Sequence, residues 1–313
     1  MRTVFFGTSG FAATVLPRLA ANAHRPALVV TPPDSRRGRG RRLAAPPAAE
    51  AARELGIELL QAASVNESDI AARIRSAEAE IGAVCAFGQL IKDPLLAELE
   101  LLNVHPSLLP RWRGAAPIER AIMTGDAETG VSIMRLTEGL DSGPVGLQER
   151  VAIDPVDDFG ALEPRLAELG GELLVSALDF CAEDRLELAE QDDGLATYSE
   201  KIESEDRHLD PSRSAAELER RVRALTPHVG AHLELEPGER FGVCAAEVWQ
   251  PRAEDQDAPE LRLEPGELAE RDGALLLGTG EGILRLASVQ PPGRKAMPAD
   301  AYLRGHPLST AAR

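Results

Sequence analysis

The first part of the chain alternates short apolar runs with amphipathic stretches. Thr3–Phe6 is apolar, Phe11–Ala21 has the spacing of an amphipathic helix, and Ala27–Val30 is apolar again. This order of strand, helix and strand predicts the opening of a doubly wound, mostly parallel, Rossmann-like α/β sheet. Ile81–Phe87 is apolar throughout, which predicts a strand buried on both faces, and Leu101–His105 predicts a further strand.

The pattern changes after a polar segment at residues 191–207. Ser212–Ala224 predicts one helix, and from His232 onward short apolar runs alternate with turns rich in Gly, Pro and Asp. Short strands at this density predict a small β-barrel. A chain of 313 residues is also long for a single core. We therefore expect an α/β domain at 1–190, a linker at 191–207 and a second domain, with the small β-barrel, at 208–313.

Polar side chains gather at the end of the strand Leu101–His105. Asn103 and His105 are two residues apart, so they face the same way on the strand. A carboxamide can stabilise an oxyanion, and an imidazole can move protons near neutral pH. Asp141 can orient His105, whereas Ser107 lacks the surroundings of a nucleophile elbow. These residues predict acyl transfer to an amine; the alternative is a hydrogen-bonded structural cluster at a strand end.

A cationic stretch, Thr31–Pro47, interrupts the α/β pattern. Against a single acidic residue, Asp34, it carries five arginines: Arg36, Arg37, Arg39, Arg41 and Arg42. Its Gly and Pro residues disfavour a helix. A mobile cationic loop suits a polyanion, and the alternative is a solvated surface loop.

The chain as a whole is acidic, with a formal net charge of -17 and a pI near 4.9. This charge argues against non-specific binding of nucleic acids. Residues 207–313 contribute only -3 of it, so a basic face on the second domain remains open. Any nucleic-acid binding would therefore come from local patches.

The remaining motifs mainly exclude functions. Gly7 and Gly10 form a G-x-x-G turn without the full dinucleotide fingerprint, so a nicotinamide site is disfavoured. Cys85, Cys181 and Cys244 are too widely spaced for a disulfide framework or a zinc site. The N-terminal apolar run is too short for a signal peptide, and no run is long enough for a membrane span. We expect a cytoplasmic protein.

Several motifs together resemble the formyltransferase family that uses 10-formyltetrahydrofolate. The main one is Ser107–Ile118, which reads Ser-Leu-Leu-Pro-Arg-Trp-Arg-Gly-Ala-Ala-Pro-Ile, followed by Gly125–Met134. Arg39–Arg42, Ala196–Ile202 and Gln290–Met297 extend the resemblance over the whole chain. It implies a formyltransferase catalytic domain followed by a tRNA-binding OB-like domain, with the formyl group passing to the α-amino group of methionine on the initiator tRNA. No metal is implied, and we expect a monomer.

The resemblance also assigns residues. Asn103 would hold the oxyanion, His105 would manage the proton, and Asp141 would tune His105 and position a water. Residues implied in folate binding are Phe87, Gly88, Gln89, Leu90, Ser107, Leu108, Leu109, Pro110, Leu140 and Ser142. Residues implied in tRNA binding are Arg36, Arg37, Arg39, Arg41, Arg42, Arg220, Arg223, Arg294 and Lys295.

Three alternatives remain open. Formyltransferases acting on sugar nucleotides or on glycinamide ribonucleotide share the catalytic trio, but the arginine stretch and the second domain favour tRNA. A formyltetrahydrofolate hydrolase would not need the second domain, and a non-catalytic RNA-binding protein would not need the trio. The sequence departs from the family at Pro106, where glycine is common, at Thr226–Gly230, and before Phe11, where an acidic residue is usual. Proline at 106 removes a backbone N–H beside His105.

Overall fold

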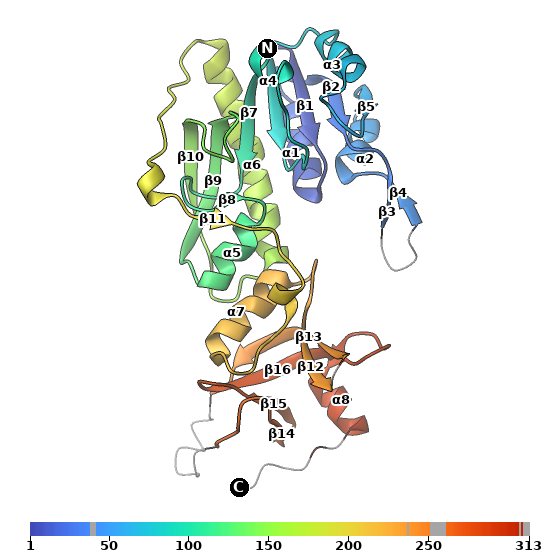
Figure 1. Ribbon diagram of the computed structural model, residues 1–313, viewed down its shortest axis with the longest axis vertical. Coiled ribbons are helices and arrows are strands. Elements are labelled where there is room, and N and C mark those ends of the chain that lie inside the picture. Colours follow the sequence, from blue (N-terminus) through green and yellow to red (C-terminus); the bar gives the residue numbers. More distant parts are fainter. Residues whose placement is uncertain (38–41, 237, 251–260, 307, 309–313) are drawn as a thin grey trace. The chain divides into compact units, whose positions relative to one another are not determined.

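The computed structural model describes residues 1–37, 42–236, 238–250, 261–306 and 308 (Figure 1). The chain divides into two compact units. The first unit comprises residues 1–117, 128–152 and 163–199, and the second comprises residues 118–127, 153–162 and 200–313. Of the predicted site residues, Arg39 and Arg41 lie outside the described residues.

The first unit is built on a seven-stranded sheet in the order β10-β9-β7-β6-β1-β2-β5. Its strands are β1 (Thr3–Gly7), β2 (Pro26–Thr31), β5 (Leu59–Gln61), β6 (Ile81–Cys85), β7 (Glu100–His105), β9 (Glu128–Arg135) and β10 (Val145–Ala152). The five strands β5, β2, β1, β6 and β7 are parallel, and β9 and β10 join antiparallel. The chain order reverses between β1 and β6, which makes this pair of strand ends the point where open α/β sheets form their sites. The predicted doubly wound, mostly parallel architecture is confirmed.

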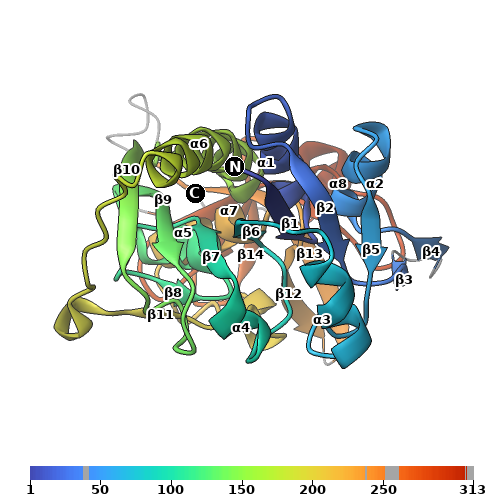
Figure 2. The ribbon, with the colours of Figure 1, turned by 90° about the horizontal axis from the view of Figure 1, so that it is seen from above.

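Helices cover both faces of this sheet, as Figure 2 shows, with α1 and α6 on one side and α3 and α4 on the other. The helices are α1 (Gly10–Ala20), α2 (Pro47–Glu54), α3 (Ser68–Arg75), α4 (Leu95–Glu98), α5 (Pro117–Thr124) and α6 (Phe159–Ala182). Most of α5 and the first four residues of α6 belong to the second unit. Val4 and Phe6 pack with Ile74 of α3 and Leu95 of α4. Phe5, between Val4 and Phe6, is also fully buried, so β1 is apolar on both faces.

The antiparallel strand β10 has no clear sequence signal. Its residues include Gln148, Glu149 and Arg150, and the strand is largely exposed at the edge of the sheet. Edge strands lack the apolar run that marks a central strand. Two further short strands, β8 (Arg113–Gly114) and β11 (Tyr198–Ser199), pair parallel with each other and also have no apolar run in the sequence. The 3-10 turn η1 (Asp193–Leu195) precedes β11.

The cationic stretch forms a hairpin. Strand β3 (Ser35–Arg37) pairs antiparallel with β4 (Arg42–Ala44), and Arg36 lies opposite Leu43. In Figure 1 this hairpin extends away from the β2 and β5 edge of the sheet. The described part of the arginine stretch is therefore an arm with strand structure and not an irregular loop.

The second unit contains an antiparallel sheet. Its strands run in the order β12-β13-β16-β15-β14, with β17 paired to β16. The elements are η2 (Glu205–Arg207), α7 (Ala215–Leu225), β12 (Ala231–Glu236), β13 (Glu239–Val248), β14 (Leu268–Arg271), β15 (Ala274–Gly278), β16 (Ile283–Gln290), β17 (Met297–Pro298) and α8 (Ala299–Gly305). The run of short strands after residue 230 was predicted, whereas α8 was not. Among the described residues of the whole chain, no helix is both long enough and apolar enough to cross a membrane.

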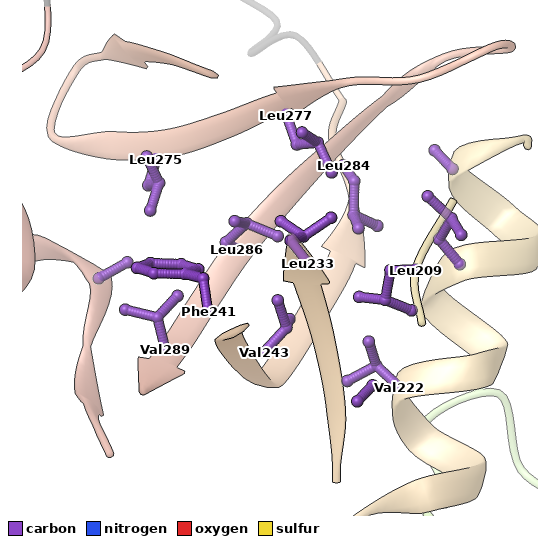
Figure 3. Close-up of a cluster of buried hydrophobic side chains, with 14 of the residues drawn as sticks. Leu209, Val222, Leu233, Phe241, Val243, Leu275, Leu277, Leu284, Leu286 and Val289 are labelled. Atoms are coloured by element: carbon purple, nitrogen blue, oxygen red, sulfur yellow. The ribbon is translucent and has the colours of Figure 1, made fainter. Parts of the chain in front are cut away.

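The core of the second unit lies between this sheet and α7 (Figure 3). Leu218 and Val222 of α7 belong to one cluster with Val243, Leu284 and Phe241 of the sheet, and all five are almost completely buried. Phe241 also meets Tyr302 of α8 edge to face, with ring centroids 5.2 Å apart. Phe241 has the largest side chain in this buried cluster, and an aromatic ring buries more apolar surface than the aliphatic side chains around it.

Replacing Phe241 by alanine should therefore lower the free energy of unfolding of the second unit by about 3–5 kcal/mol. The measurement is urea unfolding in a Trp112→Phe background, where fluorescence reports Trp249 of the second unit alone. Leu235→Ala is the control, because that side chain on β12 is 41% exposed and its loss should cost about 0.5 kcal/mol or less. Equal effects of the two substitutions would contradict the assigned core.

Candidate active site

Asn103 and His105 lie on β7, at the carboxyl end of a central strand. The strand pairs with β6 on one side and β9 on the other, and its neighbours keep both side chains out of bulk water. Asn103 is 8% exposed and His105 is 4% exposed. Within the described part of the chain, no hydrogen bond joins the Asn103 side chain to another residue, and its carboxamide atoms are not among the fully buried unpaired ones. An unpaired carboxamide that still reaches solvent at the end of a central strand is available to donate to a ligand.

The His105 ring is held by a backbone carbonyl. Its Nε2 lies 2.9 Å from the Trp112 carbonyl oxygen. A carbonyl only accepts, so Nε2 carries the hydrogen, and in the neutral ring Nδ1 is the basic nitrogen. Nδ1 lies 3.8 Å from Oδ2 of Asp141, which is too long for a hydrogen bond but close for a charge interaction. The three predicted catalytic side chains are thus arranged around the end of β7, with Asp141 beside His105.

Asp141 is fixed in an unusual backbone conformation. Its φ is 45°, in the left-handed region, which costs a non-glycine residue about 1–2 kcal/mol. Its Oδ2 accepts a hydrogen bond of 2.9 Å from the Gly114 N–H. Trp112, the other residue that contacts the imidazole, also has a left-handed φ, of 61°. Strain of this kind persists only where surrounding contacts impose it, and it is common at functional sites.

The residue that departs from the family, Pro106, fits its turn. The Ser107 N–H donates to the His105 carbonyl at 2.9 Å, which closes a three-residue turn centred on Pro106. The φ of about -65° that proline fixes is close to that of an inverse γ-turn. Ser107 is fully buried, and its Oγ donates to the Arg111 carbonyl at 2.6 Å. The hydroxyl is therefore engaged in the loop, consistent with the absence of a nucleophile elbow.

The residues predicted for folate binding differ in their exposure. Phe87 is 3% exposed and meets Phe6 edge to face, and the Gln89 amide bonds to the backbone of Ala62 and Val65. Leu109 is also buried, so it and Phe87 could offer a ligand mainly their backbone. Leu90 and Leu140, by contrast, are large apolar side chains that are more than 60% exposed.

The remaining members of the predicted folate set also differ in their surroundings. Gly88 has a left-handed φ of 75°, which a glycine adopts at little cost. Leu108, Pro110 and Ser142 are half-buried.

Cys85 ends β6 next to the site, but its thiol is not suited to nucleophilic chemistry. The side chain is fully buried, and burial raises the pKa of the Cys85 thiol far above its usual value. Among the described residues, no group of three or more His, Cys, Asp or Glu side chains could hold a metal ion.

The arginines predicted for tRNA binding fall into two groups. Arg36, Arg42, Arg294 and Lys295 are exposed, and Arg37 lies in β3. Arg220 Nε donates to the Met123 carbonyl at 3.1 Å, and Arg223 Nη1 donates to the Asp157 carbonyl at 2.6 Å, both within the second unit. These two guanidinium groups are partly committed to holding that unit together.

Two features of the site escaped the sequence analysis. The Trp112 carbonyl that holds His105 is a backbone group, for which no side chain gives a signal. Gln191, Thr197 and Ser199 lie in what was expected to be a linker, yet the structure places them in the first unit beside the Trp112–Gly114 segment. The only sequence signal was the family motif at Ala196–Ile202.

Comparison with known proteins identifies the family of the chain. Residues 1–178 match the family described as Formyl transferase, and residues 201–307 match the one described as Formyl transferase, C-terminal domain. The methionyl-tRNA formyltransferase of Rubrobacter xylanophilus is 44% identical over 316 residues, which cover 100% of both chains. That of Methylococcus capsulatus is 40% identical over 311 residues, which cover 99% of this chain and 98% of the relative.

Solved structures share the fold at low identity. HypX from Aquifex aeolicus, solved in complex with tetrahydrofolic acid, superposes with a TM-score of 0.66 at 18% identity, over 99% of this chain and 48% of that one. The N-formyltransferase from Helicobacter canadensis gives a TM-score of 0.65 at 14% identity, over 91% of this chain and 98% of that one. At these identities the likeness shows the fold alone. On the full-length relatives and the matched family regions, the chain belongs to the formyl transferase family, in the branch of the methionyl-tRNA formyltransferases.

Proposed function

We propose that this protein transfers the formyl group of 10-formyltetrahydrofolate to the α-amino group of methionyl initiator tRNA, in the cytoplasm, for translation initiation. The observation that carries the proposal is the unpaired Asn103 carboxamide at the end of β7, on the same strand as a His105 ring whose basic nitrogen faces Asp141. The full-length relatives named methionyl-tRNA formyltransferase support the choice of substrates.

The reaction moves one bond and one proton. The amine nitrogen attacks the formyl carbon, a new C–N bond forms, and the bond from that carbon to N10 of the folate breaks. The amine loses a proton and N10 gains one, so no redox partner or metal is required. His105 Nδ1 takes the proton from the amine and delivers it to the leaving nitrogen.

Asn103 and Asp141 stabilise the charges that this transfer creates. As the amine adds, the formyl oxygen becomes negative, and the Asn103 NH2 donates hydrogen bonds to it in a site with little competing water. When Nδ1 takes up the proton during transfer, the Asp141 carboxylate lies 3.8 Å away and places an opposite charge beside the new positive charge. The Trp112 carbonyl keeps Nε2 occupied throughout, so the proton exchange is confined to Nδ1.

The folate lies along the ends of β6 and β7 in this proposal. Leu90 and Leu140 offer the apolar surface that a flat ring system needs, and the backbone around Phe87 and Leu109 offers hydrogen bonds. Ser107 then contributes through the main chain, because its hydroxyl donates to the Arg111 carbonyl within the loop.

The tRNA is recognised by local cationic groups on an acidic protein. Arg36 and Arg42 on the β3–β4 hairpin, with Arg294 and Lys295 in the second unit, are exposed and suit phosphate contacts. Arg220 and Arg223 can add to these, because a guanidinium has five donors and only some are used here. We assign catalysis to residues 1–190, joined by the segment 191–207 to a tRNA-binding OB-like domain at 208–313, and we propose that the chain acts as a monomer.

The direct test is formylation in vitro. The protein is incubated with 10-formyltetrahydrofolate and charged initiator methionyl-tRNA, with charged elongator methionyl-tRNA as the control acceptor. We expect formyl-methionine on the initiator tRNA and little on the elongator tRNA. Formylation of a free sugar nucleotide or ribonucleotide amine, or hydrolysis of the folate without an acceptor, would instead support one of the alternative formyl-group reactions.

The same formylation assay, applied to variants at position 103, tests whether Asn103 stabilises the oxyanion. Removing the oxyanion donor in Asn103→Ala should lower kcat by about 10²–10³-fold, and Asn103→Asp, which puts a carboxylate at that place, should lose at least as much. Circular dichroism should show both variants folded. A kcat within threefold of wild type in either variant would remove Asn103 from the oxyanion role.

The hairpin arginines are tested by the salt dependence of tRNA binding. Arg36→Ala with Arg42→Ala should weaken tRNA binding and reduce the slope of log K against log salt by about 2, because each phosphate contact contributes about one. Folate affinity should not change. The control is Arg150→Ala, an exposed arginine on β10 that pairs with Glu128 and should leave tRNA binding near wild type. If the double variant lost folate and tRNA affinity equally, the hairpin would belong to the folate site.

A further inference from the structure

A nine-residue segment, 191–199, bonds to both residues that contact the His105 ring. Its last residues bond to Trp112 and to β8. Arg113 N–H donates to the Thr197 carbonyl at 2.9 Å, and Trp112 N–H donates to Thr197 Oγ1 at 2.9 Å. Ser199 Oγ donates to the Arg113 carbonyl at 3.1 Å. These bonds hold Trp112 in its left-handed conformation, with its carbonyl toward His105.

The other end of the segment holds Asp141 through a single side chain, Gln191. Its Nε2 donates to the Asp141 carbonyl at 2.9 Å and to the Gly143 carbonyl at 2.7 Å. The two N–H groups of one amide thereby bracket the turn that contains the strained Asp141. Its Oε1 accepts from Arg113 Nε at 3.0 Å, so both donors of the amide and its acceptor oxygen are engaged.

Arg113 connects the two halves of this arrangement. It is 3% exposed, and its Nη2 bonds to Asp193 Oδ1 at 2.8 Å. Its backbone neighbour Gly114 donates to the Asp141 carboxylate. Gln191 therefore holds the Asp141 backbone, and the Gly114 N–H holds its carboxylate. Arg113 is linked to both, because its side chain bonds to Gln191 and its backbone continues into Gly114.

We infer that Gln191 is a positioning residue for catalysis, which sets the place of the Asp141 carboxylate relative to His105. Gln191 touches neither the imidazole nor Asn103 in these contacts; it acts through the backbone on either side of Ser142. The inference rests on the proposed formyl transfer, because it assigns Asp141 the task of stabilising the protonated ring.

The discriminating variant is Gln191→Glu. Glutamate has the same shape and still accepts from Arg113, but it cannot donate to the two carbonyls. If Gln191 served only to satisfy the buried Arg113, this change would be tolerated, because it adds a charge partner. If Gln191 positions Asp141, the change is harmful, because a carboxylate faces two carbonyl oxygens.

We expect Gln191→Glu to lower kcat for formylation by about tenfold or more, as loss of orientation does, with the KM for tRNA within about twofold of wild type. Gln191→Ala should show the same split if it folds. The matched control is Asp193→Asn, which weakens the other partner of Arg113 at a side chain that is 84% exposed and should leave kcat near wild type.

A double-mutant cycle with Asp141→Asn, followed by single-turnover formylation, separates positioning from a general structural role. In the Asp141→Asn background the Gln191→Glu change should cost less than about twofold, because the carboxylate that it misplaces is already absent. Equal losses in both backgrounds, or a kcat within threefold of wild type for Gln191→Glu alone, would overturn the inference. Lack of formylation by the wild-type protein would instead contradict the proposed function, so the two failures are distinguishable.

Discussion

The hydrogen bond from His105 Nε2 to the Trp112 carbonyl is the interaction on which the site depends. At 2.9 Å it fixes both the orientation of the ring and the nitrogen that carries the hydrogen. The other nitrogen, Nδ1, then faces Asp141 at 3.8 Å and is left for proton exchange. Without this bond the ring could rotate or exchange its tautomer, and neither Asn103 nor Asp141 would have a defined partner in the reaction.

Two parts of the fold place the groups that form this bond: the central sheet and the loops beside it. The sheet holds Asn103 and His105 in fixed positions on one face, because β7 lies between β6 and β9 and is packed among buried residues. The loops provide the counterparts, and both Trp112 and Asp141 adopt left-handed backbone conformations that the surrounding hydrogen bonds impose. A strained backbone held by many bonds is already in place before substrate binds, which reduces the reorganisation that catalysis requires.

The sequence predicted the parts of the fold and site that follow from a regular pattern of apolar and polar residues. The β1 and β6 strands, the parallel sheet and the shared face of Asn103 and His105 follow from apolar runs and from the two-residue period of a strand. Strand β10 was not predicted, because an exposed edge strand carries no apolar run. The Trp112 carbonyl and Gln191 were not predicted either, because one is a backbone group and the other lies 50 residues from the Asp141 carbonyl that it holds. Pro106 departs from the family pattern, and its place at the centre of a three-residue turn suits the φ that proline fixes.

The most direct test of the account is the tautomer of His105, observed by nitrogen-15 NMR of the imidazole rings at a pH where the ring is neutral. Assignment follows from the signal lost in His105→Gln. The account predicts that the hydrogen resides on Nε2, in its bond to the Trp112 carbonyl, with Nδ1 bare and facing Asp141. A neutral His105 with its hydrogen on Nδ1 would contradict the account, because the nitrogen assigned to accept the proton of the amine would already be occupied.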